Sequence, residues 1–341
     1  MTPAISLVLL AALAAAESDP LVRGLESFRD GDYAAAEREL REALKRGGDE
    51  RAAAFLALTQ AATGRCEQAG GALAKAFQGA GGEVERLAGL ALAQCHIARN
   101  RFEDAAAVVA KLKSKHASDP DVLYQEARLH MRAWNDTIHR LYQKAPASFR
   151  VNQISGEILE IQGQFTEAAA EYRKAIEKSP RALSLHFRLG RALLMSSHAP
   201  QTLEAALKEF EAEIALNPLD SVAHFQVAQV LLVRQKPRDA ATRFERALEI
   251  NADFPEALIA LGKLRLEEAK NDEAIGLLQR AAKLQPRSEA AHYNLMMAYR
   301  NAGRLDEARR EKAEVDKLQR VPEGEFSEFL KKLGETPPTQ K

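Results

Sequence analysis

The fold pattern is clearest in Pro255–Pro286, PEALIALGKLRLEEAKNDEAIGLLQRAAKLQP. Gly262 in its first half and Ala274 in its second are small residues, which let two antiparallel helices approach closely. Large residues such as Leu261 and Leu278 fill the space around that contact, and Pro286 ends the second helix. The stretch therefore predicts one helix-turn-helix unit.

The same slots recur at a period of about 34 residues on both sides of this stretch. One period earlier the chain has Ala228, Ala240 and Phe244, and one period later it has Met296 and Ala308. Further back, the small and aromatic slots are filled by Gly156, Gly190, Tyr172 and Phe210. A single unit of this length cannot bury its own apolar face, so stacking of neighbouring units explains why the period is kept.

This slot pattern resembles that of the tetratricopeptide repeat family. The resemblance implies an all-α fold, a right-handed superhelical solenoid of antiparallel helix pairs. We count nine units, which begin near Glu17, Glu50, Arg86, Pro120, Phe149, Leu183, Ser221, Pro255 and Glu289.

The units differ in how well they match. Residues 17–119 hold three divergent units, 120–148 a shortened one, and 149–322 five closer matches. Residues 323–334 carry Phe326, Phe329 and Leu330 at helical spacing, which predicts a helix capping the last unit. The tail at 335–341 contains two prolines and is expected to be disordered.

The shortened unit lacks about five residues where its two helices should meet. We expect the chain to reverse within Met131–Asp136 without a glycine, with Asn135 capping the second helix and Trp134 packed against neighbouring helices.

The first sixteen residues are read as a signal peptide. Ile5–Ala16 is an uncharged apolar run that ends in three alanines before Glu17, and it is too short to span a bilayer. The alternative is an uncleaved apolar helix that covers the first unit. Export predicts a periplasmic or secreted protein, most naturally a bacterial one, whereas an intact N-terminus predicts a cytoplasmic one.

Composition and motifs argue against several classes of function. Lys plus Arg and Asp plus Glu both number 48, so the chain has no basic excess of the kind that binds nucleic acid. No catalytic signature is present, and the repeats leave no residues for a catalytic domain, so we expect no enzyme activity and no cofactor. His186, His224 and His292 occupy equivalent slots one per unit and would not converge on a metal ion, so no metal site is expected.

The resemblance also implies where partners bind, since in this family the first helices line the concave face. Aromatic, amide and cationic side chains fill those slots, a mixture that suits an extended peptide or an acidic segment. The candidate residues are Tyr124, Arg128, Arg150, Phe187, Arg188, Arg191, Phe225, Gln229, Tyr293 and Asn294. Arg128, Arg188 and Arg191 in particular are expected to contact the ligand. If the ligand is an acidic or carboxylate-bearing peptide, charge reversal at Arg188 and Arg191 should weaken its binding.

The two cysteines, Cys66 and Cys95, fall at the same edge of adjacent units. In an exported protein they could form one disulfide. Alternatively, both could be small buried apolar residues, because Cys95 takes a slot usually filled by alanine.

The leading functional prediction is a non-enzymatic scaffold or adaptor that binds proteins or peptides after export. The alternative is a cytosolic regulatory or co-chaperone-like module. A helical repeat that binds RNA would need a basic, base-stacking groove, which the neutral charge does not support.

Overall fold

The computed structural model describes residues 19–47 and 49–319, and these form two compact units that meet in sequence at Pro146 and Ala147. Every regular element in those residues is an α-helix, and none of them is long and apolar enough to cross a membrane. The expected signal peptide at 1–16, the capping helix at 323–334 and the tail at 335–341 lie outside the described residues.

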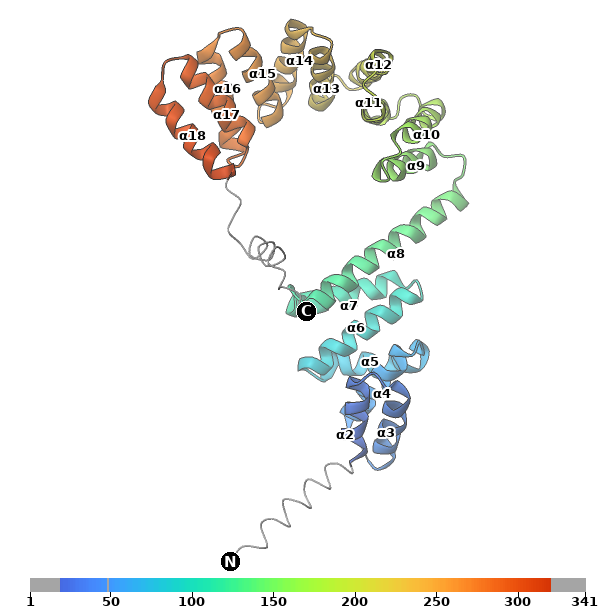
Figure 1. The fold of residues 1–341 in the computed structure, drawn as a ribbon. Coiled ribbons are helices and arrows are strands. Elements are labelled where there is room, and N and C mark those ends of the chain that lie inside the picture. The colour runs from blue at the N-terminus through green and yellow to red at the C-terminus, as the bar shows by residue number, and fades with distance from the viewer. Residues whose placement is uncertain (1–18, 48, 320–341) are drawn as a thin grey trace, which may run out of the picture. The chain divides into compact units, whose positions relative to one another are not determined.

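Unit 1 contains seven helices, shown in blue to green in Figure 1. They are α2 (Pro20–Arg29), α3 (Tyr33–Lys45), α4 (Glu50–Ala62), α5 (Cys66–Gly79), α6 (Gly82–Ala98), α7 (Phe102–Lys115) and α8 (Pro120–Lys144).

Unit 2 contains ten helices. They are α9 (Phe149–Ile161), α10 (Phe165–Lys178), α11 (Leu185–Ser196), α12 (Pro200–Leu216), α13 (Ser221–Val233), α14 (Pro237–Ile250), α15 (Pro255–Glu267), α16 (Asn271–Leu284), α17 (Glu289–Asn301) and α18 (Leu305–Gln319). Consecutive helices pack against each other within each unit, as expected of stacked helix pairs.

Local chemistry sets the helix ends. Asp49, Asp119 and Asp220 each precede a first helix and accept backbone hydrogen bonds from its first turn. In most of the pairs the chain reverses through a residue with positive φ, for example Gly163 between α9 and α10 and Asn100 between α6 and α7. These short connections force the two helices of a pair to run antiparallel.

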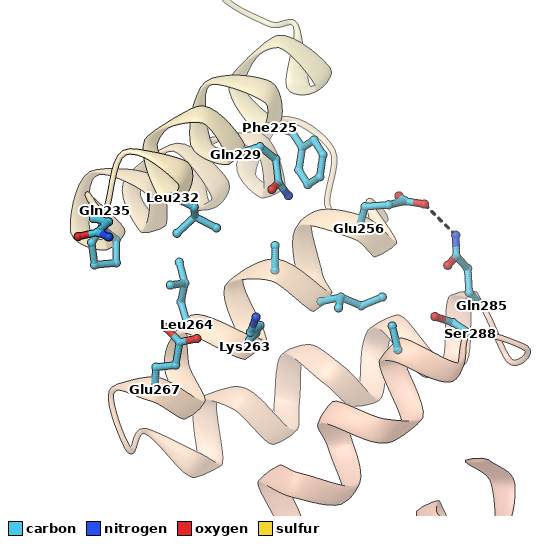
Figure 2. Close-up of a pocket in the computed structure, with 14 residues that line it drawn as sticks. Phe225, Gln229, Leu232, Gln235, Glu256, Lys263, Leu264, Glu267, Gln285 and Ser288 are labelled. Atoms are coloured by element: carbon cyan, nitrogen blue, oxygen red, sulfur yellow. Dashed lines mark hydrogen bonds between the residues drawn. The ribbon is translucent and has the colours of Figure 1, made fainter. Parts of the chain in front are cut away.

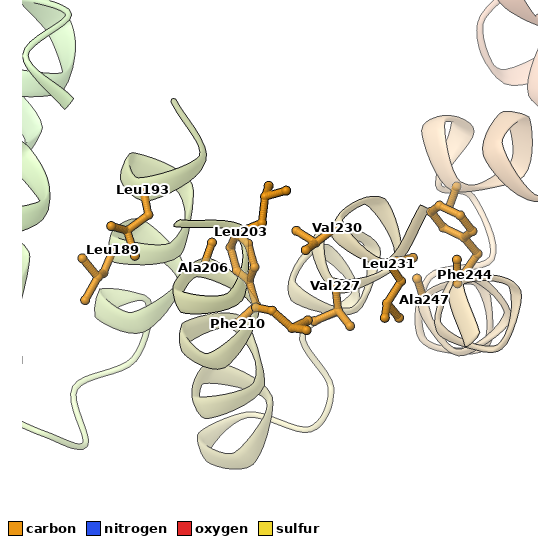
Figure 3. Packing of buried hydrophobic residues seen from close by; sticks show 14 of the residues in the cluster. Leu189, Leu193, Leu203, Ala206, Phe210, Val227, Val230, Leu231, Phe244 and Ala247 are labelled. Carbon is orange, nitrogen blue, oxygen red and sulfur yellow. The ribbon is translucent and has the colours of Figure 1, made fainter. Parts of the chain in front are cut away.

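The core of unit 2 repeats one contact, a ring or leucine of the second helix pressed against a small residue of the first. A Cβ atom added at Gly156 would lie 2.6 Å from the Tyr172 ring, and one at Gly190 would lie 2.8 Å from Phe210. Figure 3 shows the same arrangement of buried side chains along α11 to α14, with Phe210 and Phe244 inside their pairs. The small slots of the sequence pattern therefore exist because the facing side chains leave no room for more atoms.

The shortened repeat at residues 120–148 differs from its prediction. The chain does not reverse at Met131–Asp136, because α8 is one continuous helix of 25 residues. Asn135 is consequently a mid-helix residue and not a cap, and Trp134 is 47% exposed instead of packed. With too few residues for a turn and no glycine, continuing the helix keeps every backbone hydrogen bond. Eight helix pairs and one single helix therefore make up the described chain.

Cys66 at the start of α5 and Cys95 in α6 form a disulfide, with their Cα atoms 5.4 Å apart. Cys95 is also fully buried, so the covalent link and the apolar packing occur together. The bond joins the second and third helix pairs of unit 1.

Candidate functional site

A groove of about 880 Å³ runs along the first helices α13 and α15 of unit 2 and reaches the start of α17. We call it the α13–α15 groove (Figure 2). Its lining residues are Phe225, Gln229, Leu232, Gln235, Pro237, Glu256, Ile259, Ala260, Lys263, Leu264, Glu267, Gln285, Ser288 and Ala290.

The floor of the groove is apolar. Leu232 of α13 and Leu264 of α15 point toward each other across it (Figure 2). The Phe225 ring is held in place by two others, with centroids 5.0 Å from Phe254 and 5.5 Å from Phe244. Aromatic pairs at these separations are stabilising, so the ring is a fixed apolar surface and not a mobile one.

The rim of the groove is polar. At one end Gln285 donates a hydrogen bond of 3.1 Å to Glu256. Lys263 and Glu267 are exposed on α15, and neither forms an ion pair with any other residue of the described chain. One cation and two carboxylates therefore border an apolar floor and have charge to offer a partner.

Phe225 and Gln229 are the two predicted residues that line this groove. Tyr293 and Asn294 lie on the next first helix but are not among its lining residues. Tyr293 is 49% exposed, and the Asn294 amide donates to the Ala290 carbonyl of its own helix at 2.7 Å.

Arg188 and Arg191 line a separate shallow hollow of about 470 Å³, together with Met195 of α11 and residues of α9. Each already has a carboxylate, because Arg188 pairs with Glu157 at 3.1 Å and Arg191 with Glu160 at 2.7 Å. These arginines link adjacent first helices, so their charges are already paired within the chain.

The remaining predicted residues are dispersed. Phe187 packs against Phe210, with centroids 5.6 Å apart, and belongs partly to the core. Arg150 lies over the Phe149 ring at 4.5 Å and hydrogen-bonds to Gln153. Tyr124 and Arg128 lie on α8 in unit 1, with the guanidinium 5.7 Å from the ring centroid.

The three equivalent histidines are structural in different ways. His186 and His292 each contact a glutamate of the second helix, Glu209 at 2.6 Å and Glu311 at 2.7 Å. The hydrogen bond with Glu209 raises the pKa of His186, whereas burial lowers the pKa of His224. Among the described residues, no group of three or more His, Cys, Asp or Glu side chains is placed to hold a metal ion.

Sequence reasoning missed part of the groove. Ile259 takes the slot of Phe225 one period later, so the 34-residue repeat itself could have identified it. Gln285 and Ser288 belong to the connection between α16 and α17, and no periodic signal marks residues of a connection.

Comparison with known proteins identifies the repeats. Two tetratricopeptide repeat family models match residues 158–221 and 265–323. A segment of 101 residues is 30% identical to the bovine (Bos taurus) DnaJ homolog subfamily C member 3. This match covers 30% of this chain and 19% of the bovine protein.

Solved structures with a similar course of the chain share less sequence. The pilF protein of Pseudomonas aeruginosa is 18% identical, covers 72% of this chain and 97% of its own, and superposes with a TM-score of 0.47. YrrB, described as a TPR protein with an unusual peptide-binding site, is 19% identical over 57% of this chain and 97% of its own, with a TM-score of 0.45. MamA of Desulfovibrio magneticus is 17% identical over 52% of this chain and 97% of its own, with a TM-score of 0.46.

The repeat period, the small-against-large contact within the pairs and the two family-model matches agree with one another. The chain carries tetratricopeptide repeats, which the two family models match at residues 158–221 and 265–323.

Proposed function

We propose that this chain is a non-catalytic scaffold that binds an extended segment of a partner protein in the α13–α15 groove. The observation that carries the proposal is the lining of that groove, an apolar floor bordered by charged side chains that have no ion-pair partner among the described residues. The groove supports the proposal and the fold does not, because the repeat fold by itself hosts many functions.

The groove chemistry favours one kind of segment. An apolar side chain of the partner would cover Phe225 and Ile259, burying area at little entropic cost because the Phe225 ring is already fixed. Lys263 would face a carboxylate, and Glu267 would face a basic side chain. A segment with apolar anchors and charges of both signs fits better than a uniformly acidic one.

Binding in the α13–α15 groove places the partner segment away from Arg188 and Arg191. An acidic partner there would have to displace Glu157 and Glu160, whose own charges repel it. Charge reversal at Lys263 is therefore expected to weaken binding more than reversal at Arg188 and Arg191.

Export is the second part of the proposal. The apolar run Ile5–Ala16 with its small-residue ending supports a signal peptide. The Cys66–Cys95 disulfide supports the same conclusion, because such bonds persist in oxidising compartments such as the bacterial periplasm. Sequencing the N-terminus of the native protein tests this, since a start at Glu17 supports export and a start at Met1 or Thr2 supports the cytosolic alternative.

Binding is tested by capture of partners from an extract of the source organism, followed by affinity measurement with the captured protein. Lys263→Glu should weaken binding by about 1–3 kcal/mol, the range for a charge-assisted contact. Lys208→Glu is the matched control, an exposed mid-helix lysine of α12 outside the groove. Equal loss in both variants, or loss only after reversal at Arg188 and Arg191, would move the site away from the α13–α15 groove.

A further inference from the structure

Helix α8 carries an apolar stripe along its length. The stripe consists of Tyr124, Ala127, Met131, Trp134, Ile138 and Leu141. Its spacing alternates three and four residues, which is the spacing of the seam in a two-helix coiled coil. We call this set the α8 stripe.

The α8 stripe faces away from the rest of unit 1. The buried residues of α8 are Val122, Gln125 and Leu129, which lie on the opposite side of the helix, where α6 and α7 pack. Beyond Leu129, no residue of α8 is buried by the other helices of unit 1, and Figure 1 shows the helix continuing past α6 and α7. Tyr124 is 62% exposed and Met131 56%, so the stripe is an apolar surface in contact with water.

In most other repeats of the chain, the residue equivalent to Ala127 is buried. Ala127 follows Ala93 by one 34-residue period and takes the small slot of the first helix. That slot is buried in seven other repeats, at Gly24, Ala57, Ala93, Gly156, Gly190, Ala228 and Gly262.

At the four glycines among these, the side chain that fills the slot comes from the second helix of the pair. In α8 the slot is exposed, because residues 131–144 continue the first helix instead of folding back as a second one. A helix is therefore missing from the side of α8 that carries Ala127.

The residue of this repeat that should cover Ala127 is Ile138, but it lies too far along α8 to contact Ala127 of the same chain. Ile138 takes the slot that Tyr172 and Phe244 fill in their pairs, yet it lies eleven residues further along the same helix, about 16 Å from Ala127 at 1.5 Å per residue. A straight helix cannot fold Ile138 onto Ala127.

We propose that a second copy of the chain supplies the missing helix, with the two α8 helices antiparallel about a twofold axis near Arg132 and Ala133. Ile138 of the second copy then faces Ala127, Trp134 faces Met131, and Leu141 faces Tyr124. The large-against-small contact of Tyr172 with Gly156 is thereby restored between two chains. Shortening a hinge until an element must be exchanged between copies is a known route to symmetric dimers.

Charge favours the antiparallel orientation. The stripe is flanked by the cations Arg128 and Lys144, and no residue of the stripe itself carries a carboxylate. A parallel pair would bring each cation next to its own copy, which is repulsive. The antiparallel pair separates them and brings Arg128 near Tyr142 of the second copy, where a cation can lie over a ring. This dimer is independent of the α13–α15 groove and of what binds there.

Sedimentation of the full chain over a wide range of concentrations tests whether the dimer forms. Trp134 is the single tryptophan of the protein, so its emission should shift to the blue as the mass rises from monomer to dimer. Ile138→Glu should raise the dimer dissociation constant at least about tenfold, because it sets a charge against Ala127 of the second copy. Gln143→Glu, on the opposite side of the helix, should leave it unchanged.

Circular dichroism checks that the variants fold, and Met131→Glu repeats the test at an already exposed position. A wild-type chain that stays monomeric, or a dimer that neither Ile138→Glu nor Met131→Glu weakens, overturns the proposal.

Cysteine cross-linking tests the orientation. The native cysteines are already joined to each other, so they do not compete. A mixture of Ala127→Cys and Ile138→Cys chains should give a disulfide-linked dimer, whereas each variant alone should not, because like positions lie about 16 Å apart along the axis. Cross-linked dimers of each variant with itself, with no mixed dimer between the two variants, would contradict the antiparallel arrangement.

Discussion

Units 1 and 2 fill the same helix-pair contact in different ways. In the second helices of unit 1 the central slot is aliphatic, occupied by Leu40, Leu73 and Val109. In the first three pairs of unit 2 it is aromatic, occupied by Tyr172, Phe210 and Phe244. All six side chains are buried. The difference lies in how much surface each slot buries.

An aromatic ring buries more area than a leucine or valine, so a pair built on a ring gains more from the hydrophobic effect. Unit 1 gains less at this slot, and it has instead a disulfide between its second and third pairs. We infer that unit 2 depends mainly on aromatic packing and unit 1 partly on its covalent link.

The largest effect is expected from Phe210→Ala in unit 2. Removing a fully buried ring should lower the free energy of unfolding by about 3–5 kcal/mol. Hydrogen exchange resolved by repeat should show the loss in α11–α14 with little change in α2–α7. Tyr293→Ala, an exposed aromatic of the same unit, is the control and should cost less than about 0.5 kcal/mol. An equal loss of protection in unit 1 would mean that the two units unfold together.

Removing the disulfide should act on unit 1 alone. For a sequence separation of 29 residues, the chain-entropy model gives a loss of about 3–4 kcal/mol in the double variant Cys66→Ala with Cys95→Ala. Hydrogen exchange should accelerate in α4–α7 and remain unchanged in α9–α18. If protection in α4–α7 were the same without the bond, the apolar packing of unit 1 would suffice and the comparison would fail.

A smaller gain is expected from Gly71→Ala in α5. A Cβ atom there meets nothing within 4 Å, and glycine within a helix costs about 0.5–1 kcal/mol relative to alanine. The melting temperature of unit 1 should therefore rise. The same change at Gly156 should destabilise unit 2, because the new Cβ would lie 2.6 Å from the Tyr172 ring. Stabilisation by both changes would show that the ring contact is loose.

The smallest expected effect is a pH dependence of opposite sign in the two units. Hydrogen bonding to Glu209 raises the pKa of His186 in unit 2, whereas burial lowers the pKa of His96 in unit 1. The stabilisation from His186 is fully present below its unfolded pKa, near 6.5, and is lost as the pH rises through the folded value. That from His96 is present above about 6.5 and is lost as the pH falls through its folded value.

The test compares wild type with His186→Gln and His96→Gln by thermal unfolding between about pH 5 and pH 8. The wild-type advantage over His186→Gln should shrink as the pH rises, and that over His96→Gln should shrink as the pH falls. The surrounding charges are Glu209 and Glu213 for His186, and Arg99, Arg101 and Asp104 for His96. The same slope for both variants would contradict the assignment.

The sequence predicted the helix pairs because their signal is local and periodic. Gly262 facing Leu278 is encoded by spacing alone, and it recurs wherever the period holds. The candidate site was predicted only in part. Phe225 and Gln229 line the α13–α15 groove, but whether Arg188 and Arg191 are free to meet a partner depends on Glu157 and Glu160, which belong to a different helix. Pairing between helices depends on register, which a residue's own slot does not reveal.

The sequence by itself determined that this protein is an array of stacked helix pairs, because a repeated apolar pattern that cannot be buried within one unit must be buried against the next. Only the tertiary structure decided what happens where the period fails. Deleting about five residues leaves two outcomes, a tight turn or a continuous helix. The balance between them depends on what α6 and α7 can cover, and they cover only the first half of α8. The α8 stripe is exposed for that reason.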